Sequence, residues 1–206
     1  MEDILDVYQR PYDPLYPVVC MDESSKQLIG EVTPPIPAAP GHPLLQDDEY
    51  VRNGVVEIFL DVEPLAGKRN VNVTEHRTKI DWAHYIREML DNRYSEAQKV
   101  VLVMDNLNTH NTSSFYEAFA PEEASRLAKR LEIHHTPKHG SWLNVAEIEL
   151  SALKRQCLPE RIPDIKLMRQ MVYAWNIDRN SRQTTVDWQF TTEDARIKLK
   201  RLYPKL

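Results

Sequence analysis

Residues 99–105 read KVVLVMD, an apolar run of β-branched and aliphatic residues that ends in an acid. Such a run predicts a strand buried on both faces, because the strand has no polar side to turn toward water. Residues 18–22, VVCMD, have the same form. We therefore predict two central strands with Asp22 and Asp105 at their carboxyl ends, where catalytic groups gather in open sheets.

The neighbouring segments predict the rest of a sheet. In residues 49–63, two strand-like stretches flank Asn53-Gly54, a strong turn signal, which predicts a β-hairpin. Shorter strands are predicted over residues 71–74 and 131–136. Residues 33–48 contain five prolines, so we expect an extended loop there.

Helices are predicted where apolar residues recur at helical spacing. They are expected from Thr78, over 113–131 with a second helix starting at Pro121, over 142–156, over 164–178, and in a basic tail from Thr191. The order is three antiparallel strands, helix, strand, helices, strand and helix. It predicts an α/β protein with one mixed sheet and helices on both faces.

Composition narrows the class of protein. The chain has 206 residues, 42% of them apolar and 28% charged, which suits one globular domain with an appended subdomain. No stretch approaches the roughly 20 apolar residues of a membrane span, and the acidic first residues do not form a secretory signal. Cys20 and Cys157 lack metal-ligand spacing, so we expect reduced, buried thiols in a cytoplasmic protein. The net charge of −5 weakens a nucleic-acid hypothesis without excluding it, because acids grouped around metal ions add negative charge.

Acids at two strand ends suggest a metal site. Magnesium prefers oxygen ligands, and two such ions roughly 3.5–4 Å apart grip both the attacking and the leaving oxygen of a phosphodiester. A third acid would come from the helix over 142–156, which offers Glu147 and Glu149. At 100° per residue, these two point about 200° apart, so at most one reaches the site. Periodicity alone does not choose between them.

Three segments resemble the sequence blocks of bacterial insertion-sequence transposases of the mariner superfamily. They are VVCMDES (18–24), VLVMDNLNTH (101–110) and HTPKHGSWLNVAEIE (135–149). The resemblance implies a ribonuclease H-like fold, a mixed five-stranded sheet flanked by helices. It also implies a catalytic and metal-binding triad of Asp22, Asp105 and Glu147 that holds two Mg²⁺ or Mn²⁺ ions, and so it selects Glu147 over Glu149. The 41 residues between Asp105 and Glu147 exceed the usual spacing of that superfamily.

The same resemblance implies a function. Water would cut DNA at transposon inverted-repeat ends, and the freed 3′-OH would attack target DNA, expected at a TA dinucleotide. A homodimer acting at the nucleoid of a bacterial cytoplasm, without a membrane, would fit. A nuclease that only hydrolyses and an inactive DNA-binding remnant are the alternatives.

Such transposases resemble two-part proteins with helix-turn-helix modules ahead of the catalytic domain, and residues upstream of Val18 have no room for them. We therefore expect a catalytic fragment. It would comprise a lead-in segment (1–17), a catalytic domain (18–160) and a helical extension packed on that domain (161–206).

Several polar or aromatic residues flank the acids and are candidates to support them or to contact DNA: Asn106, His110, Lys138, His139, Trp142 and Asn144. The alternatives are a polar turn after Asp105 and, for Trp142, a core anchor instead of a base-stacking surface. His134 and His135 are strand neighbours that point to opposite faces, so they cannot form a joint metal pair. Asp61 and Glu63 are alternative candidates for the first acid because they lie on a predicted strand, but no sequence block supports them. The basic tail is either a solvated face or a contact to DNA or a second subunit.

Overall fold

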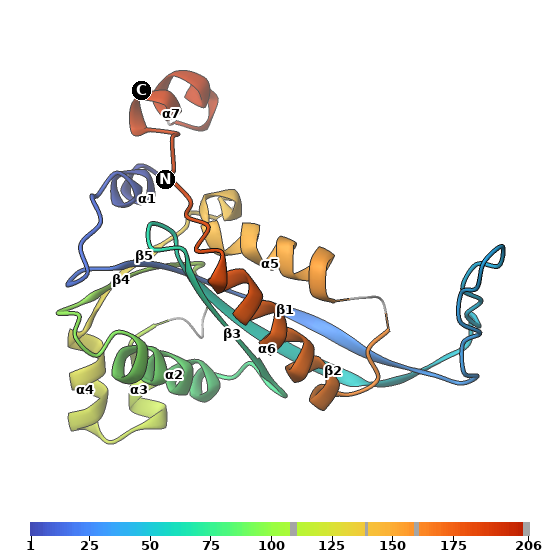
Figure 1. The fold of residues 1–206 in the computed structure, drawn as a ribbon. Helices are drawn as coiled ribbons and strands as arrows, with labels where there is room; N and C mark the ends of the chain where they lie inside the picture. Colours follow the sequence, from blue (N-terminus) through green and yellow to red (C-terminus); the bar gives the residue numbers. More distant parts are fainter. Residues whose placement is uncertain (108–110, 139, 159–160, 204–206) are drawn as a thin grey trace.

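A five-stranded mixed sheet forms the centre of the molecule (Figure 1). The computed structural model describes residues 1–107, 111–138, 140–158 and 161–203. The strands, in the spatial order β3-β2-β1-β4-β5, are β3 (Lys68–Thr74), β2 (Tyr50–Glu63), β1 (Val18–Glu31), β4 (Val100–Met104) and β5 (Leu131–His135). The first three are antiparallel, and β4 and β5 run parallel to β1. The predicted mixed sheet is confirmed.

Helices cover both faces of this sheet. One face carries α5 (Val145–Cys157) and α6 (Ile165–Ser181), with α1 (Glu2–Tyr8) and α7 (Thr192–Lys198) near its end; the other carries α2 (Lys79–Glu88), α3 (Ser113–Ala118) and α4 (Pro121–Lys129). A π-helical turn (Met89–Arg93) extends α2, and 3-10 turns lie at Ser141–Leu143 and Lys200–Leu202.

The central strand β4 explains the apolar run of the sequence. Val101 and Val103 join the core beneath α5 and α6, while Val100, Leu102 and Met104 join the core beneath α2. All five side chains are fully buried. A strand with a hydrophobic layer on each side needs no polar alternation.

The predicted hairpin over 49–63 is wrong. These residues form the single strand β2, and Asn53-Gly54 is a bulge in it: Gln27 pairs with Val55 but Ile29 pairs with Arg52. Gly54 has φ +101°, a conformation that a bulge accommodates as well as a turn. The bulge replaces the turn because β1 continues to Glu31 and supplies a partner along the whole of β2. Asp22 therefore lies within β1, not at its end.

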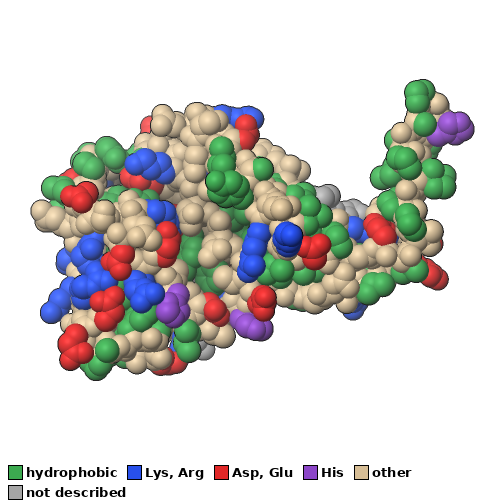
Figure 2. Space-filling model, turned by 60° about the horizontal axis from the view of Figure 1, so that its bottom comes forward, with side chains coloured by type: hydrophobic (Ala, Val, Ile, Leu, Met, Phe, Trp, Pro, Cys, Tyr) green, Lys and Arg blue, Asp and Glu red, His purple; other side chains and the backbone are tan. Residues whose placement is uncertain are grey.

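Residues 32–49 form an arm that projects from the body of the molecule (Figures 1 and 2). Two isolated bridges, Ile36–Leu45 and Ala39–His42, join its two sides, and its turn includes Gly41 at φ +82°. The proline-rich segment thus lacks a regular strand or helix, as predicted. Elsewhere, within the described ranges, no helix has both the length and the apolar character that crossing a membrane requires.

Candidate active site

Asp22 lies within β1, and Asp105 directly follows β4, the neighbouring strand that runs parallel to β1. Cys20 of β1 pairs with Val103 of β4. Asp22 lies two residues after Cys20, and Asp105 lies two residues after Val103. Because side chains alternate along a strand, each acid shares the face of the residue two before it. Cys20 and Val103 both face the core under α5, so the two acids belong to that side of the sheet.

Glu147 reaches this side from α5. It lies in the first turn of the helix and is half-buried. Glu149 points elsewhere: it is 1% exposed, and its carboxylate lies within 3.0 Å of the guanidinium groups of Arg69 and Arg179. Burial raises the pKa of Glu149, but hydrogen bonds from the two arginines outweigh burial and hold its pKa below the ordinary value. Glu149 is therefore occupied by a buried ion pair, and Glu147 is the glutamate with access to the two aspartates.

Asn144 joins the glutamate-bearing helix to the strand that carries Asp22. Its side-chain oxygen accepts a hydrogen bond from the Ala146 backbone N–H at 3.1 Å and so caps α5. Its amide nitrogen donates to the backbone oxygen of Met21 at 2.8 Å. Asn144 is 1% exposed, so it supports the site from within and does not face DNA.

The three acids act on one another electrostatically. The pKa of Asp22 is raised to about 7, mainly by burial and in addition by the negative charges of Glu23, Asp105 and Glu147. The backbone N–H of Glu23, which donates to Asp22 Oδ1 at 2.8 Å, works in the opposite direction. Repulsion of this kind arises where like charges share one site.

The carboxylates of Asp22, Asp105 and Glu147 do not converge on one metal-binding position. Among the residues that the structure describes, no group of three or more His, Cys, Asp or Glu side chains is close enough together to hold a metal ion as it stands. The donor set is nevertheless one of oxygens from two strands and a helix, which is the type of ligand that Mg²⁺ and Mn²⁺ prefer.

His135 is a supporting residue that sequence reasoning missed. Its Nδ1 lies 3.2 Å from the backbone oxygen of Asp105, so the nitrogen must donate there. The parallel register explains the contact, since His135 pairs with Met104, the residue before Asp105. His134 turns the other way, toward Asp3 and Glu132, as strand alternation predicts.

The other candidates near the site differ in their surroundings. Asn106 and Lys138 are exposed. Trp142 is 43% exposed, and its ring stacks on Trp188 with centroids 6.4 Å apart and meets Phe190 edge-on. It therefore anchors the C-terminal segment while keeping one side open. His110 and His139 lie outside the described residues.

The two rival acids on β2 belong to a separate buried network. Asp61 accepts from Arg93 at 2.6 Å and from the hydroxyl of Tyr85, while Glu63 accepts from Tyr94 at 3.2 Å. Asp61 pairs with Met21 in the sheet and so faces away from Asp22. On the opposite face of the sheet, in the core beneath α5, Cys20 and Cys157 are buried free thiols, as expected.

A family model described as "DDE superfamily endonuclease" matches residues 17–169. The chain belongs to this family. The name refers to two aspartates and a glutamate, and enzymes of the superfamily depend on divalent metal ions. No curated protein sequence matches this DDE endonuclease.

Solved structures show the fold of this DDE endonuclease. The Mos1 transposase strand transfer complex matches with a TM-score of 0.60 and 13% identity, over 89% of this chain and 53% of that one. The Mos1 paired-end complex with the left transposon end matches with a TM-score of 0.57 and 12% identity, over 85% and 52%. A simian T-cell lymphotropic virus intasome bound to the PP2A subunit B56 gamma matches with a TM-score of 0.50 and 9% identity, over 78% and 49%.

The fold of the DDE endonuclease is therefore ribonuclease H-like, as the sequence resemblance implied. The chain spans about half the length of the solved proteins that it matches.

Proposed function

We propose that this chain is the catalytic domain of a transposase that cuts DNA at transposon ends and joins it to a target. The observation that supports the proposal is the placement of Asp22, Asp105 and Glu147 on the α5 side of the sheet, near enough for the charges of Asp105 and Glu147 to raise the pKa of Asp22. Membership of the DDE endonuclease family and the fold shared with Mos1 transposase support it.

We assign Asp22, Asp105 and Glu147 as the ligands of two Mg²⁺ or Mn²⁺ ions. When bound, the ions would polarise the phosphodiester and acidify the attacking water. The chain itself contributes rigid attachment: Asp22 from a central strand, Asp105 from the end of the next, and Glu147 from a capped helix. Turning the carboxylates toward a shared cation would relieve the repulsion among them.

The remaining parts of the proposal concern partners and organisation. The DNA partner would be transposon inverted repeats and a TA dinucleotide of the target, the active species would be a homodimer, and the setting would be a bacterial nucleoid. Exposed Lys138 suits a phosphate contact, and Asn106 suits hydrogen bonds to the site or to DNA. We retain the division into a lead-in segment (1–17), a catalytic domain (18–160) and a helical extension (161–206).

A plasmid assay tests the function. The chain is incubated with Mg²⁺ or Mn²⁺ and a supercoiled plasmid that carries the DNA flanking its gene, and nicked, linear and joined products are separated on a gel. Cleavage followed by joining, both lost in Asp105→Asn, is the expected result. Cleavage without joining would identify a hydrolytic nuclease, and DNA binding without cleavage would identify an inactive remnant; either overturns the proposal.

A further inference from the structure

Tyr8 of α1 inserts its hydroxyl beneath the start of α5. The hydroxyl donates to the backbone oxygen of Leu143 at 2.6 Å and lies 3.4 Å from the backbone nitrogen of Val145, whose N–H it accepts. Cys20 Sγ of β1 lies 3.3 Å away. A phenol has one proton to donate and two lone pairs, so donation to Leu143 leaves Cys20 as the second donor to the hydroxyl. Every hydrogen-bonding position of this oxygen is therefore used.

The two backbone groups held by Tyr8 flank Asn144. Leu143 ends the 3-10 turn before α5, and Val145 begins the helix. Asn144 between them caps α5 and contacts Met21, the neighbour of Asp22. Glu147 follows within the first turn. The Tyr8 hydroxyl thus fixes the segment from which Glu147 projects, without touching the acid itself.

Contacts on the far side keep Tyr8 in place. Ile4, Leu5 and Val7 of α1 are at most 1% exposed, so the helix is anchored in the core. The ring of Tyr8 packs on Trp188 with centroids 5.1 Å apart.

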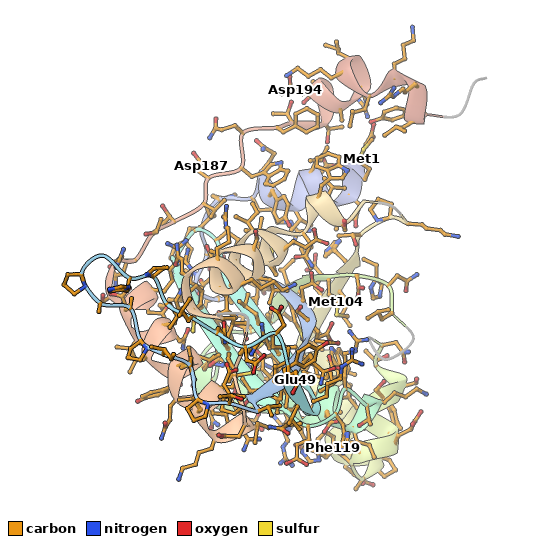
Figure 3. The ribbon with its side chains drawn as sticks, turned by 90° about the vertical axis from the view of Figure 1, so that its right-hand side faces the viewer. Met1, Glu49, Met104, Phe119, Asp187 and Asp194 are labelled. Atoms are coloured by element: carbon orange, nitrogen blue, oxygen red, sulfur yellow. The ribbon has the colours of Figure 1, made fainter. Side chains whose placement is uncertain are left out.

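The two ends of the chain also hold each other. Arg196 of α7 pairs with Glu2 at 2.8 Å, and Thr192 donates to Asp6 at 2.7 Å. Figure 3 shows Met1 beside the segment that runs from Asp187 to Asp194. Two segments lie outside the family match, α1 and the stretch from Trp188 to α7. They contact each other through Thr192 and Asp6, and the second also reaches the turn before α5, where Trp188 stacks on Trp142.

We propose that Tyr8 is a positioning residue for Glu147, and that its hydroxyl sets the placement of this metal ligand relative to Asp22. Burial raises the pKa of Tyr8, so the phenol stays protonated at neutral pH and can donate to Leu143. The proposal rests on the assignment of Glu147 as a metal ligand in the proposed function.

The test compares Tyr8→Phe with Tyr16→Phe. The first change removes the hydroxyl but keeps the ring packed on Trp188; the control removes an exposed hydroxyl that donates to Gln98, away from α5. Mn²⁺ affinity is measured by electron paramagnetic resonance of the free ion, and the melting temperature is measured without metal. We expect Tyr8→Phe, which removes the hydroxyl shared by Leu143, Val145 and Cys20, to weaken Mn²⁺ binding roughly three- to tenfold, with cleavage restored at saturating Mn²⁺. Tyr16→Phe should match the wild type.

The outcomes are distinct. Unchanged Mn²⁺ affinity in Tyr8→Phe, with only a lower melting temperature, would reduce Tyr8 to a structural role and overturn the inference while leaving the proposed function intact. A Tyr8→Phe variant that does not fold also counts against it, since the hydroxyl would then be a requirement of the fold. A wild-type chain that binds no Mn²⁺ would remove the proposed metal site and, with it, the inference.

Discussion

The side-chain nitrogen of Asn144 donates to the backbone oxygen of Met21, 2.8 Å away, and thereby joins the helix of Glu147 to the strand of Asp22. The same side chain caps α5 through its oxygen. One amide thus fixes the distance between two proposed metal ligands that are far apart in the sequence. Amide groups suit this task because they donate and accept at once.

Asn144→Asp isolates the donated bond. The carboxylate still caps α5, but it cannot donate to Met21, so we expect a loss of about 1–3 kcal/mol in the free energy of unfolding and a roughly 10–100-fold loss of cleavage. Asn144→Ala should cost about 1 kcal/mol more, because the cap is lost too. Urea unfolding and the plasmid assay measure both. Equal cleavage by Asn144→Asp and wild type would disprove the positioning role.

Glu147→Gln and Glu149→Gln should separate chemistry from stability. Glu147→Gln is expected to abolish cleavage and to leave the metal-free protein at least as stable as before, because a charge that repels Asp22 is removed. Glu149→Gln should destabilise the fold by about 3 kcal/mol, since it leaves buried Arg69 without its counter-ion. Cleavage is assayed well below the melting temperature of each variant. Loss of activity in Glu149→Gln alone would transfer the role of third ligand to Glu149.

Asp22 should make the metal-free protein less stable as pH rises. Its pKa is raised to about 7 from the ordinary value of 3.8, so the folded state favours the protonated acid. The stability cost is absent below pH 3.8, grows as pH rises, and is complete above about pH 7. Asp22→Asn should therefore raise the melting temperature at pH 8 in the presence of EDTA and change it little at pH 4. A variant that is less stable than wild type at pH 8 would contradict this.

Divalent cations should stabilise the wild type and not the triad variants. An ion that binds only the folded state at 100 times its Kd adds about 2.7 kcal/mol to the free energy of unfolding. Differential scanning fluorimetry with Mg²⁺ or Mn²⁺ should show a rise in melting temperature that shrinks in Asp22→Asn, Asp105→Asn and Glu147→Gln. Shifts of equal size in the wild type and all three variants would indicate that the ions bind elsewhere.

Local sequence was enough to predict the helices and strands whose formation depends on their own residues. The run VVLVM (100–104) became the central strand β4 because all five of its side chains are apolar. Thr78 and Pro121 mark the starts of α2 and α4, as their capping chemistry predicts. Asn53-Gly54 misled because a positive φ serves a bulge or a turn equally. Only the length of the opposite strand, β1, decides between them, and that length is a property of the pair.

Some features of the candidate site were also predictable from sequence, and others required the tertiary structure. The positions of Asp22, Asp105 and Glu147 could be named from sequence blocks, whereas periodicity left Glu147 and Glu149 equivalent. The structure distinguishes them by their partners: Arg69 and Arg179 come from distant segments and pair with Glu149 only in the folded chain, which favours Glu147 as the proposed ligand. Tyr8, His135 and Asn144 act through backbone atoms of other elements. A sequence states which residues can donate or accept, but the partner of a backbone oxygen exists only once the packing of strands and helices has brought the two together.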